Sequence, residues 1–427
     1  MKHPGKFTRH ALAIAIALAM PMTASADAAY DALKKQVEQM QKQLEQMQDA
    51  LQKQETKVKQ VEENTITRSE GKALETAVNE ASEWKDPNTL VHMSGFASVG
   101  YVDGDNQDGS FVAGNFSPIF HFQYKDMFML ESEIEFEVLD DGETNVELEY
   151  MTIDWFVNDY VALVGGKFLS PIGQFRQNMH PSWINKMASA PPGFGHDGAA
   201  PTSETGVQAR GGFPLGNMRT SYAVYAGNGP ELVAEWDGSG FELDGIDANG
   251  KGADRDGKKV WGGRFALLPM PGLEIGVSAA TGKATVTSIE DDTGTAPLLV
   301  NEQARDYDVL GFDGVWHYKS FVLRGEYVKS EIGNATTGNT ANAASSEWKS
   351  WYTQGSYQLP GTRYEGVIRY TDFDSPSDNK DQEQWAIGLN YLFANNVIGK
   401  LTYESNDGKT GTRADDDKWY FQLAYGF

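Results

Sequence analysis

The sequence contains no cysteine among its 427 residues. Disulfide bonds, thiolate metal sites, c-type haem attachment and cysteine catalysis are therefore excluded. No run of about 20 apolar residues follows the first thirty positions, so we expect no transmembrane helix there. Lysine and arginine are few, at 36 against 60 aspartate and glutamate, and the net charge is −24. This acidic balance argues against nucleic acid as a partner.

Enzyme and metal-site motifs are also missing. There is no G-x-S-x-G sequence, no Walker-type loop and no H-E-x-x-H sequence, and the seven histidines form no ligand pair. Ser182 near His180 is the one loose candidate for a nucleophile with its base. The sequence thus predicts a protein that is not an enzyme, with no catalytic residues, no metal and no cofactor.

What the chain does contain begins with an export signal. A basic start is followed by a short apolar core at residues 11–20 and by an A-x-A cleavage pattern that ends at Ala26. This order predicts a secretory signal peptide over residues 1–26. A membrane anchor is the alternative, but the apolar run is too short to span a bilayer.

Residues 27–65 carry a helical repeat with an apolar period of 3.5, and the residues between are mostly Gln, Glu and Lys. Such a stripe predicts a coiled coil with copies of the same chain, because a lone helix would expose the stripe to water. A single amphipathic helix lying on a barrel or membrane surface is the alternative. The polar residues 66–89 are interpreted as a linker. The predicted seam residues are Leu33, Val37, Met40, Leu44, Met47, Leu51, Val58 and Val61.

From residue 90 onward the apolar period changes to two. Trp385, Ile387 and Leu389, for example, alternate with Ala386 and Gly388. An apolar, aromatic side opposite a polar or small side is expected where lipid lies outside a sheet and water lies inside. The alternation and the turn signals predict sixteen strands, near 91–102, 111–125, 127–138, 145–156, 160–170, 203–213, 217–227, 259–268, 272–282, 306–318, 321–330, 347–359, 363–373, 382–393, 396–405 and 417–427.

The connections between these segments alternate in length. Every second one is tight, as at residues 125–126 and 319–320, whereas the others include the long segments 171–202 and 228–258. Short periplasmic turns alternating with long external loops are typical of outer-membrane barrels. The sheet must also close, because an open edge in hydrocarbon leaves backbone groups unpaired. We therefore predict an all-β fold: a 16-stranded antiparallel transmembrane β-barrel over residues 90–427, preceded by the N-terminal coiled-coil helix.

The chain stops on an aromatic residue at the end of an alternating strand. Phe421, Leu423, Tyr425 and Phe427 occupy every second position. Phe427 is predicted to be the assembly signal read by the outer-membrane assembly machinery. Together with the export signal, it places the protein in the Gram-negative outer membrane with the coiled coil in the periplasm. Outer-membrane lipid and lipopolysaccharide are then its expected surroundings.

Taken together, these features resemble a known family. The signal peptide, the Gln-rich coiled coil, the run Ile134-Glu135-Phe136-Glu137, the segment Gly166-Lys167-Phe168-Leu169-Ser170-Pro171-Ile172-Gly173 and the strand number are similar to the phosphate-selective porins O and P. The resemblance implies a trimer of 16-stranded barrels, each with its own pore and with the third external loop folded inward as a constriction. In members that select phosphate, a cluster of lysines and a ladder of arginines line the pore. No such lysine cluster can be placed on this sequence.

Segment 171–202 is the third long connection, and it is less polar than a solvated loop should be, as Phe175, Trp183 and Phe194 illustrate. A loop of this length in a compact domain suggests a function. We predict that it folds into the barrel, where those side chains can pack. An external loop in trimer contacts is the alternative. The residues predicted to form the pore constriction are Arg176, His180, Lys186, His196 and Asp197.

A second set of charged residues is predicted to line the pore, because they occupy the alternate strand positions that should face the lumen. Basic and acidic residues on opposite walls would create a transverse field that orients dipolar solutes. Neutralising pairs such as Arg324 with Glu326 are the alternative. The predicted pore-lining residues are Lys167, Arg210, Arg219, Arg264, Arg324, Arg369, Lys400, Glu133, Glu135, Glu147 and Glu149.

The long connection 228–258 is rich in Asp and Gly. Its spacing could bind calcium through oxygen ligands, but it lacks the terminal Glu of an EF-hand loop. Acidity that bridges lipopolysaccharide through divalent cations, or simple solubility, is favoured.

The function that these features predict is that of an outer-membrane porin: a passive, water-filled channel for small hydrophilic solutes or ions, with anions such as phosphate as one possibility. The alternative is an envelope tether or surface interaction protein built on a β-barrel. Conductance separates the two, because a tether needs no open pore.

Overall fold

The computed structural model describes residue 42 and residues 89–195, 198–291 and 293–427. The predicted signal peptide, coiled-coil seam and linker lie outside the described residues, as do His196 and Asp197. The chain divides into two units, Met1–Asp86 and Pro87–Phe427. The second unit carries the β-sheet.

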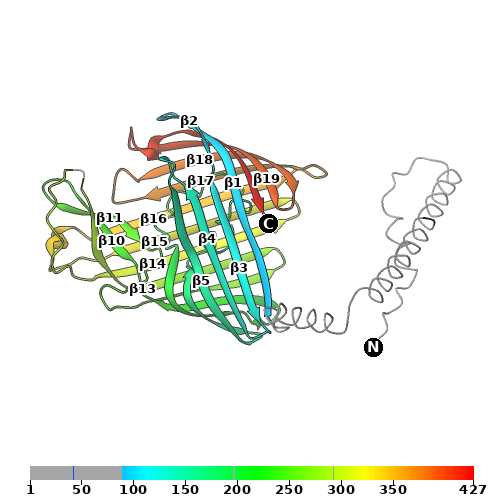
Figure 1. Ribbon diagram of the computed structural model, residues 1–427, viewed down its shortest axis with the longest axis horizontal. Helices are drawn as coiled ribbons and strands as arrows, with labels where there is room; N and C mark the ends of the chain where they lie inside the picture. The colour runs from blue at the N-terminus through cyan, green and yellow to red at the C-terminus, as the bar shows by residue number, and fades with distance from the viewer. Residues whose placement is uncertain (1–41, 43–88, 196–197, 292) are drawn as a thin grey trace, which may run out of the picture. The chain divides into compact units, whose positions relative to one another are not determined.

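Sixteen antiparallel strands in this unit close into a barrel (Figure 1). The described residues contain one sheet of 20 strands, of which four, β2, β8, β10 and β11, lie outside the main circuit, leaving sixteen. Each of the sixteen pairs with its neighbour along the chain, and β20 pairs with β1 to complete the circuit. The strands are β1 (Thr89–Gly104), β3 (Asn115–Tyr124), β4 (Phe128–Val138), β5 (Thr144–Asn158), β6 (Val161–Leu169), β7 (Ser203–Gly211), β9 (Met218–Gly227), β12 (Val260–Met270), β13 (Leu273–Glu290), β14 (Arg305–Tyr318), β15 (Phe321–Ile332), β16 (Ser346–Gln358), β17 (Tyr364–Asp374), β18 (Gln382–Ala394), β19 (Val397–Gly408) and β20 (Lys418–Gly426).

The predicted all-β barrel of sixteen antiparallel strands is confirmed, and most strand ends lie within a few residues of the prediction. Two segments differ. The second predicted strand, 111–125, begins only at Asn115, because residues before it form β2 (Gln107–Val112), which folds back onto β1. β13 runs eight residues past the predicted end at 282. Its extension pairs in parallel with β10 (Glu231–Trp236), a strand of the long connection 228–258.

The side chains of the barrel are arranged inversely to those of a soluble sheet. On β18, Gln384 and Asn390 are buried at 3% and 0% exposure, whereas Trp385 and Ile387 are 53% and 57% exposed. An apolar side chain left on the outside is stabilised only if its surroundings are apolar as well. This arrangement matches a barrel whose outer face contacts lipid.

The last residue completes the seam between β20 and β1. Phe427 and Gly95 exchange two backbone hydrogen bonds, each with an N···O distance of 2.9 Å. The Phe427 ring stacks on Phe116 at 6.0 Å between centroids. Gly95 is needed here, because a Cβ at that position would lie 2.8 Å from the Phe427 ring and 2.5 Å from the Ser117 carbonyl oxygen.

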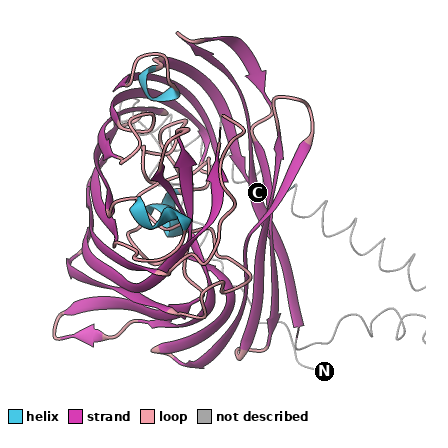
Figure 2. Ribbon diagram, turned by 90° about the vertical axis from the view of Figure 1, so that its left-hand side faces the viewer, coloured by secondary structure: helices cyan, strands magenta, loops and turns pink. Residues whose placement is uncertain are grey.

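The remaining elements belong to the connections. The hairpin of β10 and β11 (Phe241–Asp247) lies in the long connection 228–258, and β8 (Pro214–Leu215) lies in a tight turn. Three short helical turns are described: η1 (Phe175–Met179), η2 (Asn339–Asn342) and η3 (Arg413–Asp415). Within the described ranges, none of the helical segments has the length and apolarity of a membrane-spanning helix. Figure 2 shows η1 and its flanking loops surrounded by the strands of the barrel.

Candidate pore constriction

The connection between β6 and β7 lies along the inside of the barrel. Its two ends are adjacent, because the Ser170 N–H donates to the Thr202 carbonyl at 2.9 Å. From there the chain crosses to the far wall, where the Gln174 N–H donates to Glu326 on β15 at 2.9 Å. The Gln174 side chain also donates to Glu274 on β13 at 2.9 Å. We call residues 171–202 the inner loop.

Its helical turn η1 and the residue that follows bring two predicted constriction residues against the inner face of β4 and β5, which carries several glutamates and is called the acidic wall. Arg176 Nη2 lies 3.4 Å from Glu149 Oε2, and both side chains are buried. His180 Nε2 lies 3.6 Å from Glu133 Oε1, and its other ring nitrogen contacts the Arg176 carbonyl. The His180 ring also packs edge-on against Phe96 of β1. The inner loop therefore contacts β4 and β5 on one side of the barrel and β13 and β15 on the other side.

Apolar side chains of the inner loop pack against the barrel wall. Phe175 and Phe194 are 4% and 1% exposed, and their rings contact Tyr352 of β16, whose ring centroid is 5.0 Å from that of Phe194. Met187 is fully buried beside Val367 and Ala386. These contacts give the apolar side chains of the loop the packing that the sequence required.

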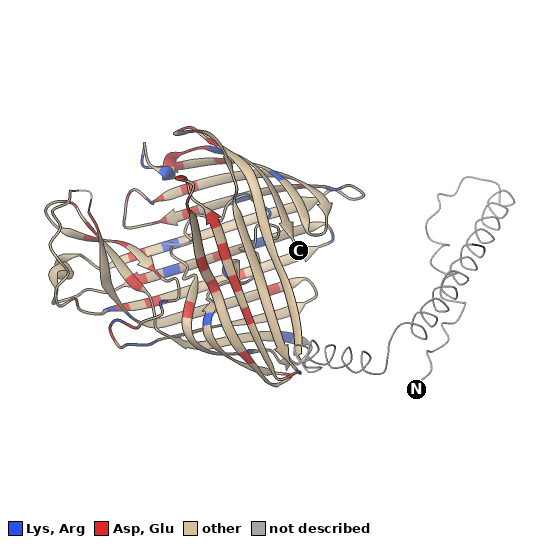
Figure 3. Cartoon of the chain, viewed as in Figure 1, with Lys and Arg blue, Asp and Glu red and all other residues tan. Residues whose placement is uncertain are grey.

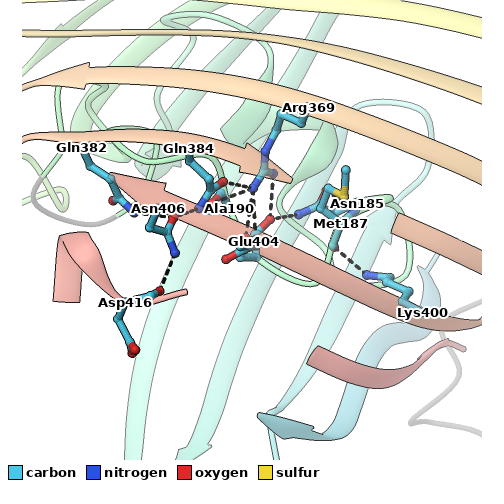
Figure 4. Close-up of polar contacts among 11 residues, drawn as sticks. Asn185, Met187, Ala190, Arg369, Gln382, Gln384, Lys400, Glu404, Asn406 and Asp416 are labelled. Atoms are coloured by element: carbon cyan, nitrogen blue, oxygen red, sulfur yellow. Dashed lines mark hydrogen bonds and ion pairs between the residues drawn. The ribbon is translucent and has the colours of Figure 1, made fainter. Parts of the chain in front are cut away.

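The second half of the inner loop is bound to the wall through its main-chain carbonyls. It passes over β19, β18, β17, β16 and β15, and one buried polar side chain from each strand donates to it. Figure 4 shows the contacts around two of these side chains. We call the five side chains the donor ladder. They are Lys400 with Ser182 O (2.5 Å) and Met187 O (2.9 Å), Asn390 with Lys186 O (2.9 Å), Arg369 with Ser189 O (3.0 Å), Ser350 with Pro192 O (2.7 Å) and Ser330 with Ala199 O (2.7 Å).

Two ladder residues were predicted to line the pore. Lys400 and Arg369 do face inward, but each is only 1% exposed, so neither presents its charge to open solvent. Arg369 lies 3.6 Å from Glu404, and Glu365 lies 3.4 Å from Lys186 of the inner loop.

Two more predicted residues form ion pairs on the inner wall. Arg210 pairs with Asp154, which is completely buried. Arg264 donates through Nε to Asp313 Oδ2 at 2.8 Å and through Nη2 to Glu274 at 2.8 Å. Both arginines border a recess of about 400 Å³ at the short-turn end of the barrel. Their carboxylate partners were not predicted.

The Arg264 pair supports a stability prediction. The Asp313 side chain is 0% exposed and that of Arg264 is 10% exposed, and removing one partner of a buried pair leaves an uncompensated charge. We expect Asp313→Asn to lower the unfolding free energy by about 3 kcal/mol, measured by urea titration in detergent micelles. The matched control is Asp306→Asn on the same strand, whose side chain is 69% exposed and whose loss should cost less than about 1 kcal/mol. Equal losses for the two variants would contradict the prediction.

Three other predicted pore-lining residues occupy different environments. Arg324 faces inward and contacts the Met179 sulfur of the inner loop. Arg219 is exposed at the short-turn end, opposite Pro214 in the register. Lys167 is out of phase, because it pairs with Met151, whose side chain is on the outer face, while Phe168 points inward. Its ammonium nonetheless reaches the acidic side chains of the inner wall, because it lies 3.8 Å from the Glu147 carboxylate.

The acidic wall comes from β4 and β5, where Figure 3 shows acidic segments along both strands. β5 bulges here, since Glu133 pairs with Tyr150 but Ile134 pairs with Leu148, which leaves Glu149 as an extra residue. Glu149 and Tyr150 are consequently both buried.

Two further glutamates of this wall were predicted to line the pore. Glu135 lies opposite Glu147 in the register. The Glu147 carboxylate lies 3.8 Å from the Lys167 ammonium. Both glutamates are partly exposed.

Several carboxylates of the connection 228–258 are engaged within the protein. Asp244 contacts Lys380 at 2.6 Å, and Asp254 contacts Lys259 at 2.7 Å. Burial raises the pKa of Asp256, and its carboxylate accepts from Thr285. Among the described residues, no three acidic or histidine side chains form a group that could hold a metal ion.

Comparison with known proteins finds one matching family model and shows the fold. The family model described as phosphate-selective porin O and P matches residues 273–424. The predicted resemblance is confirmed. An anion-selective porin from Comamonas acidovorans superposes with a TM-score of 0.52 at 13% identity, covering 79% of this chain and 100% of that chain. OmpT of Vibrio cholerae in its trimer form gives a TM-score of 0.52 at 12% identity, covering 79% and 99%. No curated protein sequence matches the chain.

Proposed function

We propose that the chain forms a passive, water-filled diffusion channel in the Gram-negative outer membrane for small hydrophilic solutes or ions. The observation that carries this proposal is the closed barrel of sixteen strands with its polar face inside and its apolar face outside. A barrel of this strand number is wide enough to leave an aqueous channel. Solutes would pass down their gradient without chemistry or energy input.

The inner loop is proposed to be the constriction of this channel. Its contacts with Glu149 on one wall and with the donor ladder on the other support this role. Lys186, whose side chain is 29% exposed, would then present its charge near the narrowest cross-section, and Arg176 and His180 would border it from the β4–β5 side. Anions such as phosphate remain among the proposed solutes, because the matched family and these basic side chains both favour them.

A channel rather than an enzyme is also favoured by the surroundings of Ser182. Its hydroxyl has no hydrogen-bond partner among the described residues, and the His180 ring is directed to the Arg176 carbonyl and to Glu133. A nucleophilic serine needs a base within hydrogen-bond reach. We further propose that the barrel assembles as a homotrimer in contact with lipopolysaccharide, with its coiled coil in the periplasm.

Planar-bilayer recording tests the proposed function. Purified mature protein should give stepwise currents, and its reversal potential in a salt gradient should report the preference between anions and cations. Phosphate added to one side should reduce chloride current if phosphate binds in the pore. A protein that is folded by circular dichroism but gives no steps would favour the tether alternative. Cation preference without phosphate block would remove the phosphate proposal but leave the channel.

A further inference from the structure

The inner loop has little regular secondary structure of its own, and this creates a physical problem. A carbonyl group in a water-filled lumen can bond to water, and a segment solvated in this way is free to move. A constriction of fixed size requires that the carbonyls be bound by the wall. The donor ladder meets this requirement at six carbonyls: those of Ser182, Lys186, Met187, Ser189, Pro192 and Ala199.

The order of the ladder follows the order of the strands. Its members lie on β19, β18, β17, β16 and β15, and the first carbonyl that each one binds follows the same order, from Ser182 through Lys186, Ser189 and Pro192 to Ala199; the second Lys400 contact, Met187, falls after Lys186. All five side chains are at most 1% exposed. The loop is therefore attached around almost a third of the barrel circumference, five of sixteen strands, by side chains that are shielded from water.

The Lys400 contacts indicate a structural role for this charge. An ammonium group has three N–H donors, and here they meet Ser182 O, Met187 O and Gln422 Oε1 at 2.5, 2.9 and 2.8 Å. Among the described residues, no carboxylate lies within ion-pair distance of it. Its hydrogen-bonding capacity is thus filled by the loop and the wall, and no donor remains for a passing solute.

Arg369 is used in a similar way. Its guanidinium donates to Ser189 O and Ser189 Oγ at 3.0 Å and to Gln384 Oε1 at 2.8 Å. Between Arg369 and Lys400, the Met187 side chain is buried where Gly388 leaves room, since a Cβ on Gly388 would lie 3.2 Å from the Met187 sulfur. The two cations and this methionine together hold the middle of the loop.

We infer that the five ladder residues are positioning residues that fix the inner loop against the wall and so set the cross-section of the pore. The inference rests on the proposed channel function. It assigns Arg369 and Lys400 to holding the loop rather than to contacting solutes. The three uncharged members, Ser330, Ser350 and Asn390, contribute to the same task.

The test combines current recording with thiol labelling in the full-length protein. The chain has no cysteine, so Met187→Cys introduces a single thiol at a position that is 0% exposed. Lys400→Met removes two wall bonds to the loop, and we expect it to increase the labelling rate of that thiol by about tenfold. The matched control is Lys349→Met, which makes the same change on the outer face of β16. It should leave labelling unchanged.

The uncharged members separate positioning from electrostatics. Ser330→Ala with Ser350→Ala alters no charge, so we expect larger open-channel noise and an altered conductance with an unchanged reversal potential. Heat-modifiable migration on gels identifies variants that fail to fold. Unchanged labelling in Lys400→Met and unchanged conductance and noise in the double serine variant would overturn the inference. If the wild-type protein itself gives no current steps, it is the proposed function that fails, and the labelling comparison still decides whether the ladder holds the loop.

Discussion

Removing the inner loop should increase the single-channel conductance several-fold. The loop occupies the lumen from the far wall, at Gln174 and Glu326, to the acidic wall, at Arg176 and Glu149. A bare barrel of sixteen strands leaves a wide aqueous channel. The conductance of such a channel is limited by its narrowest cross-section, so deletion of the segment that fills this cross-section has a large effect.

The structure shows where the excision can be made. Ser170 and Thr202 are already joined by a backbone hydrogen bond of 2.9 Å, so a short Gly-Ser turn can connect them without moving β6 or β7. The wall donors that lose their carbonyl partners would face water, which satisfies them. We therefore expect the shortened barrel to remain folded.

A matched deletion isolates the effect of position. Residues 294–300 lie in the connection between β13 and β14, where Leu298 is 83% exposed. Their removal should leave the conductance close to that of the wild type. A barrel without residues 171–201 that stays folded yet conducts like the wild type would show that the narrowest cross-section lies elsewhere.

The strands could be predicted from the sequence because their signal is local. Alternation between outward Trp385 and inward Gln384 is present within a few residues, and lipid on one side makes it strong. The predicted inward or outward facing of side chains differs from the structure where the backbone departs from regular pairing. The bulge at Glu149 and the pairing of Lys167 with the outward-facing Met151 are the examples.

The environment of an inward residue could not be predicted in the same way. Parity places Lys400 and Arg369 on the inner face, but the carbonyls that cover them are about two hundred positions away in the chain. Ser330 and Ser350 carry no charge and resemble any other residue of a polar face. Their role becomes visible only when the path of the inner loop is known, and no local pattern encodes that path.

Loss of the final residue should greatly reduce the amount of assembled barrel. Phe427 supplies one N–H and one carbonyl to Gly95, and these two bonds extend the seam between β20 and β1. Without them, two backbone groups of β1 would be unpaired at the sheet edge, each costing several kcal/mol if it lies in hydrocarbon. The Phe427 ring also covers Phe116 and Tyr425.

Two substitutions divide the contribution of the backbone from that of the ring. Phe427→Ala retains both bonds to Gly95 but removes the aromatic side chain that we predict the assembly machinery reads. Phe427→Tyr retains the bonds to Gly95 and an aromatic ring, and it is the matched control. We expect assembled protein, measured by heat-modifiable migration of outer-membrane fractions, to fall most in the deletion, substantially in Phe427→Ala and little in Phe427→Tyr.

Refolding of the same variants into detergent without assembly machinery separates the two causes. If Phe427→Ala refolds normally there but does not assemble in cells, the ring acts as the signal. Normal assembly of the deletion variant in cells would rule out both roles, because neither the seam bonds nor the ring would then be required.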